Sequence, residues 1–99
     1  MPIVETGSKR VTLRLIVVGR VQGVSYRASL RDRALGAGVD GWVRNLDDGS
    51  VEALLQGEET DVRRVADWAR VGPPAAEVSG VIEEVQQGYP RLSGFRVAA

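Results

Sequence analysis

The segment best suited to chemistry runs from Gly19 to Arg27 and reads GRVQGVSYR. Gly19 and Gly23 let the backbone turn, so that successive N–H groups can converge on an anion just before a helix begins. Arg27 falls in the first turn of that helix, where the helix dipole disfavours a cation by up to about 1 kcal/mol. A phosphate or carboxylate bound there would balance this charge, because a guanidinium can bind two phosphoryl oxygens at once.

The loop and the arginine do not by themselves establish an anion site. Many strand-to-helix turns contain two glycines for tight packing alone, and a solvated side chain is the ordinary interpretation of Arg27. The loop lacks the Lys-Ser/Thr pair of a Walker A loop, and the chain contains no G-x-G-x-x-G. Asn45 is a second polar candidate, but it lies just before the turn sequence DDG and could equally be a turn-flanking residue.

The absence of histidine and cysteine excludes most familiar active sites. Without them there is no Ser-His-Asp or Cys-His catalysis, no zinc site and no histidine acid–base step. Positive and negative residues number 13 each and are interleaved, so we expect no nucleic-acid partner and no membrane partner. Asp47 and Asp48 fit turn chemistry better than metal binding, and we expect no metal and no cofactor.

Two periodic segments place the loop between a strand and a helix. Residues Val11 to Gly19 alternate along the chain and predict a strand that is more buried on one side. Apolar residues then recur at spacings of three and four, which predicts a helix with Ser25 as its N-cap and an end at the glycines of residues 36–38. The apolar stripe consists of Tyr26, Leu30, Ala34 and Ala37.

The rest of the chain repeats the same order of elements. The segments Val39 to Leu46 and Ser50 to Gln56 predict two strands, and the Asp-Gly pair between them predicts an antiparallel hairpin closed by a turn with positive φ at its centre. A second helical pattern falls within residues 57–74. It is followed by a strand within residues 76–87 and a short strand within residues 94–99.

The order strand, helix, strand, repeated twice, predicts an α+β fold of the ferredoxin-like, split βαβ type. In this sandwich an antiparallel sheet carries both helices on one face, and a short C-terminal strand is added. The chain of 99 residues is the size of one domain, which we expect over residues 10–99 after a flexible tail over residues 1–9. Strands joined by a crossover run parallel, so the loop after the first strand and Asn45 should lie at the same sheet edge.

The segments GRVQGVSYR and GWVRNLDDGSVEALLQG resemble the two signatures of the acylphosphatases. These read roughly G-x-V-Q-G-V-x-Phe/Tyr-R and G-W-V-x-N-x-x-D/N-G-x-V-E, and the likeness runs from about Thr12 to the last strand. Members of this family are small ferredoxin-like enzymes that hydrolyse carboxyl–phosphate mixed anhydrides without a metal. The resemblance implies that Arg27 binds the phosphoryl group with the backbone N–H groups of the loop and that Asn45 positions the attacking water. The loop residues concerned are Arg20, Val21, Gln22, Gly23, Val24 and Ser25.

Mild departures from the family and two other functions stay open at this level. Tyr26 stands where the family usually has Phe, so its hydroxyl needs a partner, and the C-terminal sequence FRVAA lacks the more familiar aromatic ending. One alternative is a non-catalytic binding module for a small anion or for regulation, since fold does not dictate function. An RNA-binding version needs exposed aromatics on the central strands, and at most Trp42 and Phe95 could lie on the sheet. The other alternative is an accessory module of a larger carbamoyl-phosphate-handling protein.

The expected reaction has small partners only. The resemblance implies an acyl phosphate as substrate and inorganic phosphate as a product. The sequence contains neither a signal-peptide h-region nor an apolar stretch long enough to span a membrane. We therefore expect a cytoplasmic monomer.

Overall fold

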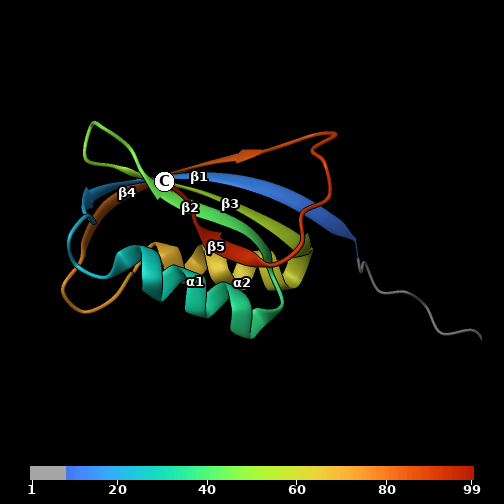
Figure 1. Ribbon diagram of the computed structural model, residues 1–99, viewed down its shortest axis with the longest axis horizontal. Helices are drawn as coiled ribbons and strands as arrows, with labels where there is room; N and C mark the ends of the chain where they lie inside the picture. Colours follow the sequence, from blue (N-terminus) through green and yellow to red (C-terminus); the bar gives the residue numbers. More distant parts are fainter. Residues whose placement is uncertain (1–8) are drawn as a thin grey trace, which may run out of the picture.

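The computed structural model describes residues 9–99, which form a five-stranded sheet with two helices on one face (Figure 1). The elements are β1 Arg10–Arg20, α1 Tyr26–Ala37, β2 Asp40–Asn45, β3 Val51–Glu58, α2 Glu59–Ala69, β4 Glu77–Val85 and β5 Phe95–Val97. Residues 1–8 of the predicted tail lie outside the described residues. Lys9 is described, and its carbonyl accepts a hydrogen bond of 2.9 Å from the backbone N–H of Glu59.

The strand order β4-β1-β3-β2-β5 confirms the predicted ferredoxin-like fold. The first four strands in this order pair antiparallel, whereas β5 pairs parallel to β2, so the sheet as a whole is mixed. Strands β1 and β2 are both antiparallel to β3 and therefore run in the same direction. Val17 of β1 and Asn45 of β2 both lie opposite Val51 of β3, in one row across the sheet. The carboxyl end of β2 thus lies at the same sheet edge as the loop after β1, as predicted.

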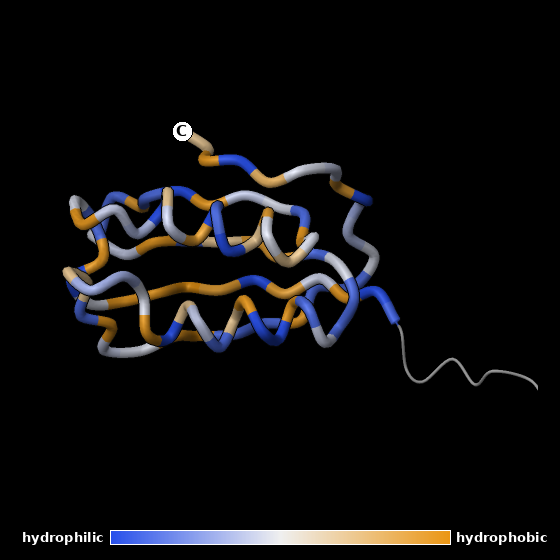
Figure 2. Tube along the Cα trace, turned by 90° about the horizontal axis from the view of Figure 1, so that it is seen from below, coloured by the Kyte–Doolittle hydropathy of each residue, from blue (hydrophilic) through white to orange (hydrophobic). Residues whose placement is uncertain are grey.

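The core lies between the sheet and the helices and follows the predicted periodicities. Alternate residues of β1 and β3 face the helices, and the predicted stripe of α1 faces the sheet, although Ala37 at its end is only partly buried. Figure 2, seen from the helix side, shows hydrophobic stretches in the strands behind both helices. Burying one Val or Leu side chain contributes about 1.5–3 kcal/mol to the stability of the fold. The core between sheet and helices therefore holds in place the sheet edge that carries the loop between β1 and α1. The fully buried aliphatic residues include Leu15, Val17, Leu30, Val43, Val51 and Leu55.

The β2–β3 hairpin is present, but its turn differs from the predicted one. Leu46 and Ser50 enclose a tight loop of three residues, 47–49, in which Gly49 has a positive φ, 94°. The backbone N–H of Leu46 donates to the carbonyl of Ser50 at 2.9 Å and closes the loop. A three-residue loop that ends in a left-handed glycine also matches the twist of a hairpin. The Asp48 carboxylate accepts from the N–H of Ser50 at 2.9 Å, which confirms its assignment to turn chemistry.

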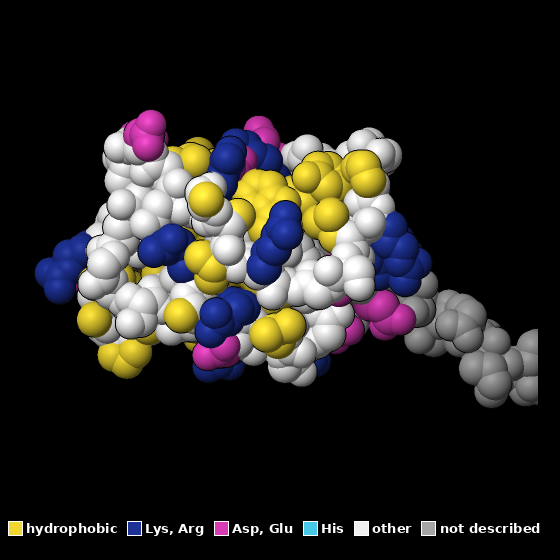
Figure 3. All heavy atoms as spheres, in the orientation of Figure 1, with side chains coloured by type: hydrophobic (Ala, Val, Ile, Leu, Met, Phe, Trp, Pro, Cys, Tyr) yellow, Lys and Arg dark blue, Asp and Glu magenta, His cyan; other side chains and the backbone are white. Residues whose placement is uncertain are grey.

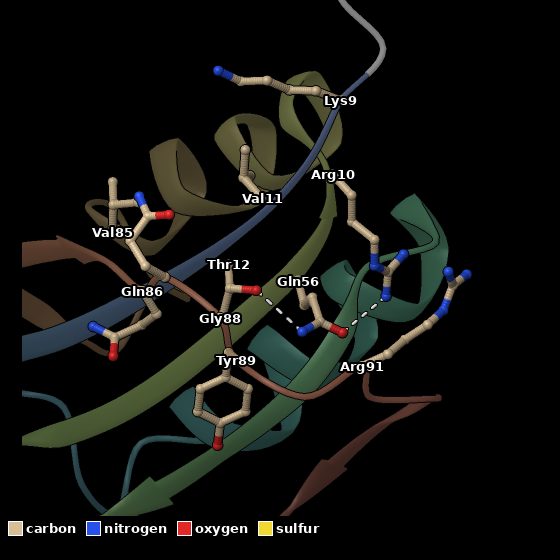
Figure 4. Close-up of a pocket in the computed structure, with 11 residues that line it drawn as sticks. Lys9, Arg10, Val11, Thr12, Gln56, Val85, Gln86, Gly88, Tyr89 and Arg91 are labelled. Atoms are coloured by element: carbon tan, nitrogen blue, oxygen red, sulfur yellow. Dashed lines mark hydrogen bonds between the residues drawn. The ribbon is translucent and has the colours of Figure 1, made fainter.

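The sheet face away from the helices is partly covered by the segment between β4 and β5 (Figure 1). Gln56, which is buried, fixes this segment by donating to the carbonyl of Pro90 at 2.9 Å and accepting from the N–H of Leu92 at 2.6 Å. Gln56 also binds Thr12 and Arg10, as drawn in Figure 4. A cavity of about 560 Å³ lies here, on the opposite face of the sheet from the helices. It contains none of the predicted site residues.

Candidate active site

The loop between β1 and α1 has the backbone conformation expected of an anion-binding turn. Gly23 has φ 76° and Ser25 has φ 66° and ψ 21°, both in the left-handed region. Among residues 9–99, Ser25 is the only residue other than glycine with a positive φ. Such a residue costs about 1–3 kcal/mol of strain and is typical of binding sites, where successive N–H groups form a concave nest.

Ser25 occupies the N-cap position of α1, as predicted, but its side chain makes no capping hydrogen bond. A capping side chain reaches the N–H groups of the first turn from an extended backbone, and the left-handed conformation of Ser25 does not provide that geometry. The N–H groups at the start of α1 are therefore not satisfied by this side chain.

The charges around the start of α1 are the reverse of those around α2. The first turn of α2 contains Glu59 and Asp61, which complement the positive end of the helix dipole. The first turn of α1 contains no acidic residue and carries Arg27 instead. The start of α1 thus concentrates positive potential that the helix itself does not neutralise, as a site for an anionic ligand requires.

Arg27 is free to bind a ligand. Its side chain is half-buried, and it makes no hydrogen bond or ion pair with any residue of the described part of the chain. It lines a cavity of about 180 Å³. The loop, the start of α1 and the end of β5 form this cavity through Val21, Gly23, Ser25, Tyr26, Arg27, Ala28 and Val97.

Asn45 ends β2 and carries an unpaired polar atom. Its side-chain oxygen Oδ1 is buried and has no hydrogen-bond partner within residues 9–99. Leaving such an acceptor unsatisfied costs about 1–3 kcal/mol, and such atoms are rare in folded proteins. A water molecule or a ligand atom is the partner that this oxygen requires.

The side chain of Gln22 connects the loop to the hairpin that follows Asn45. Its amide Nε2 donates hydrogen bonds to the carbonyl of Leu46 at 2.8 Å and to the carbonyl of Ser50 at 2.9 Å. On the other side of β2, Val97 of β5 lies opposite Val43, and the N–H of Ala98 donates to the Val43 carbonyl at 2.8 Å. Strand β5 therefore brings Val97 to the cavity that Arg27 lines.

The predicted residues are brought to one end of the molecule, but not all of them line the cavity. Val21, Gly23, Ser25 and Arg27 do so, whereas Gln22, Val24 and Asn45 do not. Arg20 belongs to strand β1, where it lies opposite Glu77 of β4. Asn45 lies two residues beyond Val43 on the same face of β2.

Tyr26 fixes the start of α1 against the end of α2. Its hydroxyl donates a 2.7 Å hydrogen bond to the carbonyl of Ala69, the last residue of α2, and so provides the partner that the sequence left open. Burial raises the pKa of this hydroxyl, so it stays protonated and remains a donor. Its ring lies 5.9 Å from that of Trp68, measured between centroids. Arg27, the next residue, is thereby held on a fixed backbone.

Residues 13–97 match the profile of the acylphosphatase family. The chain belongs to this family. It is 45% identical over 89 residues to an acylphosphatase of Pelotomaculum thermopropionicum, covering 90% of this chain and 97% of that protein. It is 53% identical over 88 residues to an acylphosphatase of Anaeromyxobacter dehalogenans, covering 89% and 95%.

Solved structures agree with this assignment. The fold matches that of an acylphosphatase from Coxiella burnetii with a TM-score of 0.86 and 36% identity, over 94% of this chain and 99% of that one. The predicted family, fold and enzyme class are confirmed, and a non-catalytic binding module is not favoured. No helix within residues 9–99 is long and apolar enough to cross a membrane. Across the same residues, no cluster of three or more acidic side chains could hold a metal ion.

Three features of the site were not foreseen from the sequence. Gln22 was expected to contribute its backbone N–H, whereas the structure also gives its carboxamide a bridging role. Val97 enters the cavity because β5 pairs parallel to β2, and a strand of three residues carries no pattern that reveals its partner. The unpaired oxygen of Asn45 depends on the packing around it, for which a single sequence has no signal.

Proposed function

We propose that this enzyme hydrolyses acyl phosphates to a carboxylate and inorganic phosphate without a metal ion. Arg27 and the backbone N–H groups of residues 20–25 bind the phosphoryl group, and Asn45 orients the attacking water. The main support is that Arg27 has no partner among residues 9–99 and lines a cavity at the start of a helix without acidic residues in its first turn. An anion is the ligand that this arrangement favours.

The loop and Arg27 supply the electrostatic part of catalysis. Phosphoryl transfer passes through a loose transition state that needs positioning and stabilisation of charge on the equatorial oxygens. Backbone N–H groups already held in a left-handed turn do not have to reorganise as this charge develops. Loss of one such donor in other enzymes costs about 2.7–4 kcal/mol, or about 10²–10³ in kcat.

The leaving group explains why the site can work without histidine or cysteine. An acyl phosphate releases a carboxylate whose conjugate acid has a pKa of about 4. The carboxylate can therefore leave unprotonated at neutral pH, taking the electron pair of the breaking P–O bond. No general acid is required, so the residues that remain need only bind, orient and stabilise charge.

Asn45 acts on the nucleophile by orientation. An amide is too weak a base to deprotonate water, but its unpaired Oδ1 can accept a hydrogen bond from a water molecule and aim its oxygen at phosphorus. As the new P–O bond forms, the water proton passes to a phosphoryl oxygen of the substrate. Correct positioning of two reactants is worth several kcal/mol in well-oriented systems, about 7–11 kcal/mol at most.

The domain, the location and the assembly complete the proposal. Residues 10–99 form the catalytic domain, and the enzyme acts as a cytoplasmic monomer on small substrates, with no nucleic-acid or membrane partner. The balance of 13 positive and 13 negative residues supports this choice of partners. Lys and Arg side chains are also scattered among other residues on the face shown in Figure 3.

Hydrolysis of benzoyl phosphate tests the proposal. The purified protein should cleave it in buffer with EDTA as fast as in buffer with Mg²⁺. Inorganic phosphate should inhibit competitively, because it occupies the same nest. No turnover above spontaneous hydrolysis would reject the proposed reaction, and sensitivity to EDTA would reject its metal-free mechanism.

A further inference from the structure

The carboxamide of Gln22 connects three parts of the site. Gln22 lies in the loop between β1 and α1, one residue before Gly23 with its positive φ. Both hydrogens of its Nε2 are used, one on the carbonyl of Leu46 and one on that of Ser50. Leu46 directly follows Asn45, and Ser50 directly precedes Val51, the residue opposite Asn45. One side chain therefore binds the loop to the two residues that join the hairpin turn to β2 and to β3, next to Asn45.

These hydrogen bonds link the loop between β1 and α1 to the segment next to Asn45, and the proposed reaction requires a fixed distance between the two. The loop sets where the phosphorus atom sits, and Asn45 sets where the water sits. The carbonyl of Ser50 also accepts from the N–H of Leu46 at 2.9 Å, so Gln22 and the hydrogen bond that closes the hairpin share one acceptor. Val21, the residue before Gln22, also fixes the loop, because its side chain is 1% exposed and belongs to the core.

We infer that Gln22 is a positioning residue that fixes the phosphate-binding loop relative to Asn45 and its water. The inference rests on the proposed function, since it concerns the geometry of that reaction. In-line attack needs the water oxygen behind phosphorus, and a displacement of about 1 Å costs on the order of 10²-fold in rate. Phosphate affinity depends on Arg27 and the loop N–H groups, which Gln22 does not replace.

The test uses Gln22→Met, which keeps the length of the side chain and removes both donors. We expect kcat for benzoyl phosphate to fall between about 10-fold and 10²-fold, with the inhibition constant of inorganic phosphate changed less than about threefold. Gln87→Met is the matched control, because Gln87 is exposed and lines the cavity on the opposite face. An unchanged kcat in folded Gln22→Met, or a loss of phosphate affinity equal to the loss of kcat, would overturn the inference.

A double-mutant cycle with Asn45→Ala distinguishes positioning from a merely structural role. If Gln22 acts through Asn45, Gln22→Met should lower kcat little further in the Asn45→Ala background, because the water is then no longer oriented. Equal fold-losses in both backgrounds would show that Gln22 does not act through Asn45. Thermal unfolding of each variant confirms that assays run on folded protein. Turnover by the unmodified enzyme tests the proposed function separately.

Discussion

Replacing Arg27 by Gln should separate function from stability. The Arg27 side chain has no protein partner in the described structure, so its removal breaks no hydrogen bond or ion pair. It also removes a cation from the first turn of α1, where the helix dipole opposes it by about 0.3–1 kcal/mol. Without ligand, the free energy of unfolding of Arg27→Gln should equal that of the parent or exceed it by up to about 1 kcal/mol.

The expected catalytic loss follows from the hydrogen bonds that we propose between Arg27 and the phosphoryl group. Two charge-assisted hydrogen bonds, at about 1.5–3 kcal/mol each, amount to about 3–6 kcal/mol. Each 1.36 kcal/mol is a factor of ten in rate, so kcat/KM should fall about 10²–10⁴-fold. Glutamine can keep one neutral hydrogen bond, which places the expected loss toward the lower half of that range.

The assay combines benzoyl phosphate turnover with urea unfolding in the absence and presence of phosphate. A phosphate concentration of 100 times its Kd should stabilise the parent by about 2.7 kcal/mol and the variant far less. Arg31→Gln is the matched control, since Arg31 lies one turn further along α1 and pairs with Asp32 on the surface. Full activity of Arg27→Gln, or a stability loss of several kcal/mol, would refute the reasoning.

Three other substitutions test the remaining parts of the account. Asn45→Ala should lower kcat about 10²–10³-fold, because the attacking water is no longer oriented. Its free energy of unfolding should stay equal or rise by up to about 1 kcal/mol, because the substitution breaks no hydrogen bond to Oδ1. Unchanged turnover would contradict the role proposed for Asn45. Tyr26→Phe should lower the free energy of unfolding by about 1–3 kcal/mol, because it leaves the carbonyl of Ala69 without this hydrogen bond. KM should stay unchanged. Tyr89→Phe, at an exposed site, is the control. Burial acts to raise the pKa of Glu52, but hydrogen bonds from Arg14 and Arg44 outweigh it and hold the pKa below its ordinary value. The ionised carboxylate therefore stabilises the fold at neutral pH, and this contribution is lost as pH falls below about 4. Glu52→Gln should lower the free energy of urea unfolding by about 1–3 kcal/mol at pH 7 and by clearly less at pH 3. An equal loss at both pH values would show that the charge of Glu52 does not matter.

The fold could be predicted because its signals are local and periodic. Alternation located β1 to within one residue at each end, and the spacing of Tyr26, Leu30 and Ala34 identified the buried face of α1. The crossover rule then placed the loop and Asn45 at one sheet edge without any knowledge of side-chain packing. The parallel pairing of β5 was beyond such rules, since its three residues carry no register information.

The candidate site residues could be named from the sequence, whereas most of their geometry could not. Arg27 could be identified as a candidate from the sequence, because the helical pattern places its charge in the first turn, where it opposes the helix dipole. Ser25 was predicted correctly as the N-cap, but its residue type does not reveal the left-handed backbone or the missing side-chain hydrogen bond. The hydrogen bond from Gln22 to Leu46 joins residues 24 apart in the chain, and the burial of the Asn45 oxygen depends on packing, so neither has a local sequence signal.

A crystal structure of the enzyme with inorganic phosphate tests the central claim most directly. The account predicts one phosphate in the turn between β1 and α1, contacted by the Arg27 guanidinium and by backbone N–H groups of residues 20–25. Asn45 should lie within reach of a water on the far side of the phosphorus atom. A phosphate bound elsewhere, with the turn empty and Arg27 directed into solvent, would contradict it.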